Sequence, residues 1–156
     1  MKRRKPMSTD ITKEEWYKEY KSLNAEAADV LLAIIPDMEE AGFTSHFSRG
    51  KKAGNATWRM GYVRPDGNSI NITQAYGKRG TGNTFVGCFW VSGKCRGDVP
   101  DKWRGAVNDA LGRLKSKLGG TKKGGPDLDP VALGEAHLRI AFQELARDLK
   151  AITGTA

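Results

Sequence analysis

The stretch ATWRMGYVRPDGNSINITQAY, residues 56–76, decides the fold class of this 156-residue chain. On both sides of its centre, apolar residues alternate with polar ones, and β-branched and aromatic residues are frequent, as is typical of half-buried strands. The centre contains Asp66-Gly67, a strong signal for a tight turn between antiparallel strands. The stretch therefore predicts a β-hairpin.

Two further strand-like runs flank this hairpin: FTSHF at residues 43–47 and TFVGCFWV at residues 84–91. Segments rich in glycine and basic residues connect them to it, SRGKKAGN at residues 48–55 and GKRGTGN at residues 77–83. Because short connections usually join strands that are neighbours in space, we expect the four strands to form an antiparallel meander.

Helical patterns lie before and after the predicted strands. Thr12 and Glu15 have the spacing of a capping box, and apolar residues then recur every three or four positions as far as Pro36, where we expect the helix to be interrupted. After the strands, Asp98 is predicted to cap a second helix that Gly119 ends.

The predicted fold class is α+β, with one helix, four strands and two helices in that order, and with the helices packed on one face of a four-stranded antiparallel meander sheet. We expect the chain to divide into a disordered basic tail at 1–9, an α+β core domain at 10–118, a flexible linker at 119–128 and a C-terminal helix at 129–153. That helix docks either on the core or on a partner chain.

The charge is distributed unevenly along the chain. Of a formal net charge of +8, residues 43–97 carry the whole excess, because they contain nine lysines and arginines and a single acid, Asp66. Residues 10–40, in contrast, contain nine acids and three lysines. Charge that is segregated in this way indicates a polyanionic partner more strongly than a solubilising charge spread uniformly over the surface would.

The meander would bring the two basic connections together, since the first and third connections of a meander leave from the same end of the sheet. Their glycines allow the backbone to approach a ligand closely, and successive N–H groups in such turns can bind anions. Binding of a phosphate backbone requires positive charge but does not require each charge to be aligned with a particular base. The residues predicted to bind nucleic acid are Arg49, Lys51, Lys52, Arg59, Lys78, Arg79 and Trp90.

The alternation within the strands also sorts side chains between the two faces of the sheet. The residues predicted to face the helices include Trp58, Met60, Tyr62, Ile70, Ile72 and Tyr76. Those predicted to face outward are Thr57, Arg59, Asn71, Thr73, Thr84 and Trp90. An outer face with such polar groups and an indole could stack on unpaired bases and hydrogen-bond to them.

No motif in the chain indicates catalysis, and we predict no catalytic residue, cofactor or metal site. His46 and His137 are the only histidines and have no second ligand nearby in the sequence, while GKRGTGN lacks the order of a P-loop. Cys95, between two cations, is the one candidate for a reactive thiol. Two cysteines without a CxxC pattern predict reduced thiols in a cytoplasmic protein.

The sequence thus predicts a small non-catalytic nucleic-acid-binding protein, with DNA or RNA and single strand or duplex left open. The alternative is a protein-interaction module that acts through its helices: a small inhibitor, adaptor or chaperone of the kind that phages and mobile elements encode. A homodimer through the C-terminal helix is also left open. No apolar run reaches the length of a membrane span, so no membrane partner is expected.

Overall fold

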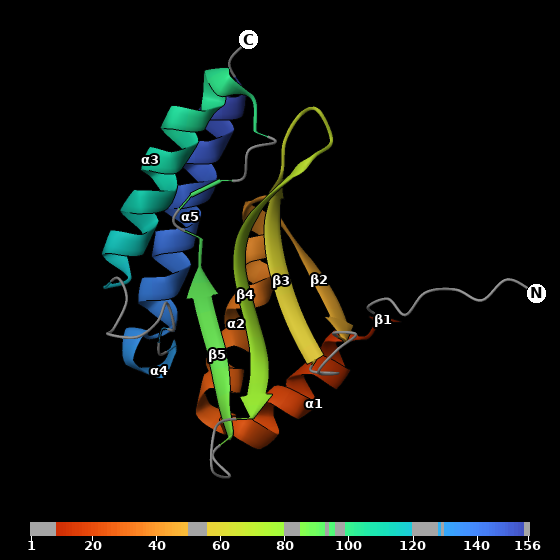
Figure 1. The fold of residues 1–156 in the computed structure, drawn as a ribbon. Helices are drawn as coiled ribbons and strands as arrows, with labels where there is room; N and C mark the ends of the chain where they lie inside the picture. The colour runs from red at the N-terminus through yellow and green to blue at the C-terminus, as the bar shows by residue number, and fades with distance from the viewer. Residues whose placement is uncertain are drawn as a thin grey trace, which may run out of the picture.

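The protein combines an antiparallel sheet with helices, so the predicted α+β class is confirmed (Figure 1). The computed structural model describes residues 9–49, 56–79, 85–92, 94–95, 99–119, 128 and 130–154. For residues 9, 77–79, 85–88 and 90 the description covers the backbone alone. Within these residues, no helix has the length and apolar content that a membrane span requires.

The sheet has five strands in the order β1-β2-β3-β4-β5, each antiparallel to its neighbour. Their bounds are β1 Thr9–Asp10, β2 Phe43–Arg49, β3 Ala56–Val63, β4 Ser69–Arg79 and β5 Phe85–Val91. The sequence predicts four strands, and β1 is an addition, because two residues are too few to give an alternating pattern. Thr9 pairs with Arg49 and so does not belong to the predicted tail, whose residues 1–8 lie outside the described part.

The helices are α1 Lys13–Leu23, α2 Ala25–Ala41, α3 Asp101–Lys117, α4 Pro130–Leu133 and α5 Glu135–Thr153. α1, α2 and α5 lie against one face of the sheet, and α3 packs beside α5 (Figure 1). α5 contacts the sheet through Phe142, whose ring meets Phe43 edge-on, and through Thr153, whose hydroxyl lies 3.3 Å from the Tyr62 hydroxyl. The opposite face of the sheet, called here the open face, has no helix packed on it in the view of Figure 1.

Trp16 of α1 fastens the helical layer to the sheet. Its side chain is fully buried, and its ring lies within 6 Å of those of Phe47 in β2 and Trp58 in β3. Its Nε1–H donates to the carbonyl oxygen of Ala75 in β4 at 3.0 Å. The capping box predicted just before it is confirmed, since Thr12 and Glu15 exchange both hydrogen bonds. The start of α1 therefore sets the position of three strands.

The first helix is broken at a different residue from the one predicted. Asn24 ends α1 and begins α2, because its side chain accepts a hydrogen bond from the backbone N–H of Ala27 at 3.1 Å. Pro36, where the interruption was predicted, lies inside α2, which ends at Gly42 with φ of 120°. A hydrogen bond from an Asn side chain to the local backbone competes with continuation of the helix. Here that bond ends α1 and begins α2 at Asn24.

The C-terminal half also differs in detail from the prediction. α3 is preceded by Pro100 without a side-chain cap, and the predicted cap Asp98 lies outside the described residues. Gly134, with φ of 87°, separates α4 from α5 where a single helix was predicted. Within the predicted linker, Gly119 and Leu128 are described. The N–H of Leu128 donates a hydrogen bond to the carbonyl oxygen of Phe89 in β5, the last strand of the sheet, at 2.7 Å.

Candidate functional site

The two basic connections begin at the same end of the sheet, as the meander predicts. Arg49 pairs with Ala56, and Thr57 pairs with Tyr76, so Ala56 lies level with Gly77 in β4. Because neighbouring strands are about 5 Å apart, the backbones of Arg49 and Gly77 are separated by about 10 Å. We call the strand ends Arg49, Ala56, Gly77–Arg79 and Phe85 the basic end (Figure 1).

Of the seven predicted binding residues, Arg49 and Arg59 have described side chains and the other five do not. Lys51 and Lys52 lie outside the described residues, between the two strand ends that pair at Arg49 and Ala56. Lys78 and Arg79 are described by their backbone, which pairs with Val86 and Phe85 of β5. Trp90 is likewise described by its backbone alone, opposite Gln74.

Arg49 lies on the helix side of the basic end and has an acidic partner. Its guanidinium forms an ion pair with Glu19 of α1. The hydrogen bond that Glu19 accepts raises the pKa of Arg49 above its ordinary value. Its side chain is 37% exposed, so the pair is accessible to solvent and competes with any anionic ligand for this guanidinium.

A β-bulge changes which residues of β4 reach the open face. Met60 pairs with Thr73 but Gly61 pairs with Asn71, which leaves Ile72 as an extra residue. The alternation therefore inverts after Ile72, as a bulge requires. Thr73, predicted to face outward, is fully buried. Tyr76, predicted to face the helices, is half-buried and pairs with Thr57 on the open face.

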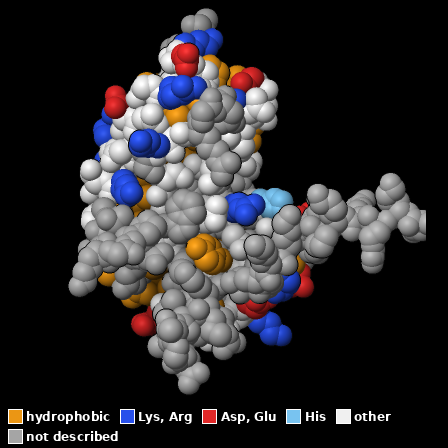
Figure 2. All heavy atoms as spheres, viewed as in Figure 1, with side chains coloured by type: hydrophobic (Ala, Val, Ile, Leu, Met, Phe, Trp, Pro, Cys, Tyr) orange, Lys and Arg blue, Asp and Glu red, His pale blue; other side chains and the backbone are white. Residues whose placement is uncertain are grey.

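A row of four residues crosses the sheet from β2 to β5. His46 pairs with Arg59, Arg59 with Gln74, and Gln74 with Trp90. The side chains of His46 and Arg59 are exposed on the open face, and Gln74 is half-buried. His46 Nε2 lies 3.0 Å from Asp10 Oδ1 of β1, so an acid accompanies the histidine at the edge of the row. Figure 2 shows this face with a basic side chain beside a histidine near its centre, and with acidic side chains toward its margins.

Arg59 differs from most arginines of the described part of the chain in having no acidic partner there. The arginines that pair with carboxylates are Arg49, Arg64, Arg104, Arg113 and Arg139. In the described part of the chain, no carboxylate lies within ion-pair distance of Arg59. Its positive charge is therefore available to a ligand.

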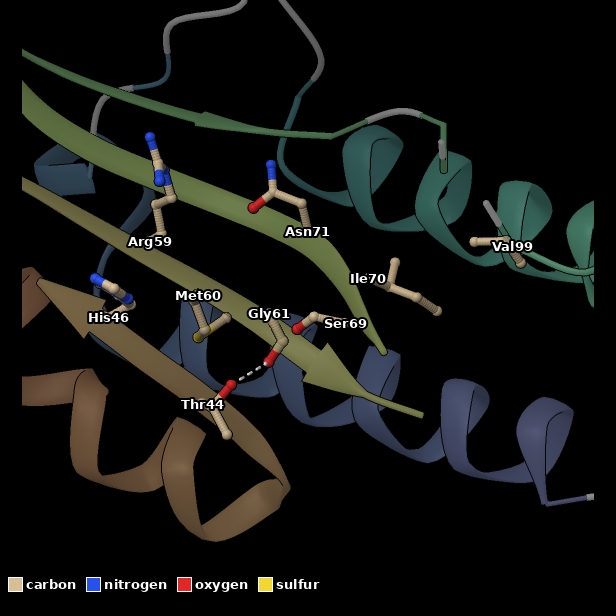
Figure 3. Close-up of a pocket in the computed structure, with 9 residues that line it drawn as sticks. All are labelled: Thr44, His46, Arg59, Met60, Gly61, Ser69, Ile70, Asn71 and Val99. Atoms are coloured by element: carbon tan, nitrogen blue, oxygen red, sulfur yellow. Dashed lines mark hydrogen bonds between the residues drawn. The ribbon is translucent and has the colours of Figure 1, made fainter. Parts of the chain in front are cut away.

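Beside Arg59 the open face is hollowed. The hollow has a volume of about 350 Å³, and the residues that line it are Thr44, His46, Arg59, Met60, Gly61, Ser69, Ile70, Asn71 and Val99 (Figure 3). In Figure 3, Arg59 and Asn71 rise from neighbouring strands on the same side of the sheet. Among the residues that the structure describes, the lining contains hydroxyl, amide, imidazole and guanidinium groups and no carboxylate. Such a set of groups favours a ligand with hydrogen-bond acceptors and negative charge.

The other residues considered from the sequence lie away from this face. His137 Nε2 is 2.8 Å from the carbonyl oxygen of Lys117, which places it at the end of α3. Cys95, the candidate for a reactive thiol, is half-buried and packs against the core. No cluster of three or more His, Cys, Asp or Glu residues that could hold a metal ion occurs among the residues described.

Sequence reasoning missed the contributions of Gln74, Tyr76 and Ser69 to the open face. For Gln74 and Tyr76 the reason is the bulge, which has no signal in the apolar pattern of β4. Ser69 stands at the first position of β4, where alternation is too short to assign a face. No family model, curated protein or solved structure matches this chain.

Proposed function

We propose that this chain is a non-catalytic nucleic-acid-binding protein. Its basic end holds the phosphate backbone, and its open face contacts bases or sugars. The observation that carries the proposal is the register of the sheet, which starts both basic connections at one end. Neither connection contains an acid, since residues 48–55 and 77–84 have no Asp or Glu.

Arg59 extends this positive region onto the open face. It lies three residues along β3 from Ala56, a distance of about 10 Å at the ordinary rise of a strand. A strand of nucleic acid held at the basic end would therefore reach Arg59 within a few nucleotides. Contacts to phosphate give affinity, while contacts on the open face give whatever base preference the protein has.

The salt dependence of binding tests the proposal. Labelled single- and double-stranded DNA and RNA are titrated with the full chain at several salt concentrations, with fluorescence anisotropy as the readout. If the five cations of the two connections each neutralise one phosphate, the logarithm of the association constant should fall with the logarithm of salt with a slope of about −3.5 for single strands or about −4.5 for duplex.

Two variants with equal net charge test which positive charges contribute to binding. The first changes Lys51, Lys52, Lys78 and Arg79 to Ala; the matched control changes Lys18, Lys94, Lys102 and Lys150 to Ala. We expect the first variant to lose about 0.7 of the single-strand slope for each contact removed and the control to keep the slope of the unmodified chain. A slope near zero for the unmodified chain, or equal losses in both variants, would contradict the proposal.

The alternative function, a protein-interaction module acting through the helices, has less support. The apolar stripe proposed to dock on a partner is used inside the chain, because Leu138, Phe142, Leu145 and Leu149 of α5 are buried. α5 makes contacts with both α2 and α3. In the described part of α5, Ile140 is the large apolar residue left exposed, and a single exposed residue of this kind is ordinary on a protein surface.

A further inference from the structure

We propose that the hollow beside Arg59 receives one unpaired base, so that the protein binds single strands in preference to duplex. This inference rests on the proposed function and specifies its substrate class, which the charge pattern leaves open. It is carried by the composition of the hollow, in which apolar and hydrogen-bonding groups lie next to the guanidinium of Arg59, which has no acidic partner among the described residues.

The hollow offers both kinds of contact that a base requires. Met60, Ile70 and Val99 lie at the floor of the hollow, where each of them is at most 2% exposed, so the apolar surface open to a ligand is small. The amide of Asn71 can donate and accept hydrogen bonds, as can the hydroxyl of Ser69. A base has an apolar ring face and a polar edge, so it can use both. The volume of about 350 Å³ lies at the small end of ligand pockets and suits a single nucleotide.

The charges at the rim fit the phosphate that accompanies a base. Arg59 is exposed, and its planar guanidinium can donate two parallel hydrogen bonds to a phosphate. His46 lies opposite it in the neighbouring strand. Asp10, which lies 3.0 Å from His46, contacts the histidine from the side of β1 and is not part of the lining. Of the described lining residues, Arg59 is the one with a permanent charge.

The apolar part of the hollow argues for a base over an isolated phosphate. A phosphate ion makes no use of the apolar floor of the hollow, because it must keep hydrogen bonds to all its oxygens. A duplex holds its bases stacked in pairs and cannot present one to a concave surface without the cost of flipping it out. A single strand presents unstacked bases freely, and recognition of single strands generally uses such bases.

The test compares strands that have the same phosphates but differ in their bases. A labelled 12-nucleotide single strand, the same strand with abasic residues and a hairpin duplex are each titrated with the full chain. We expect the abasic strand and the duplex to bind on the order of tenfold more weakly than the intact strand. Nucleoside monophosphate at millimolar concentration should compete only weakly, since a free nucleotide lacks the contacts of the basic end.

Variants of the hollow connect this preference to the proposed site. Asn71→Leu removes the amide and narrows the hollow, and Ser69→Phe fills it from an exposed position in case the first variant fails to fold. We expect either folded variant to bind intact and abasic strands about equally. Val63→Thr, on the same strand as Arg59 but outside the lining, should keep the preference.

The outcomes separate this inference from the proposed function. If intact, abasic and duplex substrates bind equally with a steep salt slope, the basic end binds nucleic acid and the hollow does not receive a base. A preference for intact strands that survives Asn71→Leu and Ser69→Phe would also overturn the inference, because the bases would then be read elsewhere. If no substrate binds, the proposed function itself is wrong.

Discussion

The two ends of the sheet differ in where their arginines find acidic partners. At the turn between β3 and β4, Arg64 is buried, and its Nε and Nη2 donate to the two carboxylate oxygens of Asp66 at 3.0 and 3.1 Å. Asp66 also accepts a hydrogen bond from the backbone N–H of Asn68, which completes the turn. At the basic end neither connection contains an acid, and Arg49 takes its partner from α1.

The comparison shows that a count of basic residues does not measure the charge offered to a ligand. Arg64 belongs to the basic middle of the chain, yet its charge is neutralised two residues later and its side chain is 1% exposed. Arg59, five residues earlier, is exposed and has no acidic partner in the described residues. Burial and partners therefore assign the first arginine to stability and leave the second exposed, as the proposed binding role requires.

The largest expected effect comes from replacing the buried arginine. Arg64→Ala should lower the free energy of unfolding by about 2–3 kcal/mol, because it removes a packed side chain and two charge-assisted hydrogen bonds. Arg59→Ala should change the same quantity by less than about 0.5 kcal/mol, as is usual at the surface. Urea unfolding of the two variants measures the difference, and equal losses would show that Arg59 also has a structural role.

Acid pH should lower the stability contributed by the turn between β3 and β4. The hydrogen bond from Arg64, together with that from the backbone of Asn68, lowers the pKa of Asp66 below its ordinary value of 3.8. Because its pKa is lower in the folded than in the unfolded state, the ionised Asp66 stabilises the fold. This stabilisation is complete above the pKa that Asp66 has in the unfolded chain, and it is lost as pH falls through the pKa that Asp66 has in the folded chain.

Thermal unfolding between pH 2.5 and pH 7 measures this loss. We expect Asp66→Asn to be less stable than the unmodified chain at pH 7 and to show a flatter decline below about pH 4. Glu144, whose pKa is lowered by Lys117, contributes in the same direction in both proteins and so serves as an internal reference. Parallel curves for the two proteins would mean that Asp66 does not stabilise the turn through its charge.

The smallest expected effect concerns the ion pair at the basic end. Glu19→Gln should change stability by no more than about 0.5 kcal/mol, because both partners are partly exposed. It should raise the affinity for nucleic acid by about twofold, since the ion pair of Arg49 with Glu19 is lost and a negative charge is removed near the phosphates. Glu39→Gln, an exposed position on α2, makes the same change of net charge as a control, and an equal gain there would exclude a local effect.

Features that depend on neighbours in the sequence could be predicted. The capping box of Thr12 and Glu15 is formed within one turn of helix, and the Asp66-Gly67 turn within four residues. The buried stripe of α3, from Trp103 to Leu118, follows directly from helical periodicity. In each case the residues that decide the structure are also those that contact one another.

Features that depend on residues far apart in the sequence could not be predicted. The ion pair of Arg49 with Glu19 joins residues 30 positions apart, so the sequence gives the charges without their pairing. The bulge at Ile72 arises from how β4 fits β3, and it moves Thr73 and Tyr76 to the faces opposite to those predicted. The hollow has the same origin, because Val99 and Asn71 meet only in the folded chain.

The row of His46, Arg59, Gln74 and Trp90 also sets a length scale for recognition. It crosses three gaps between strands, or about 14 Å at the ordinary spacing. A stacked strand advances by about 3.4 Å per nucleotide. A ligand laid perpendicular to the strands would thus cover the row with about four nucleotides.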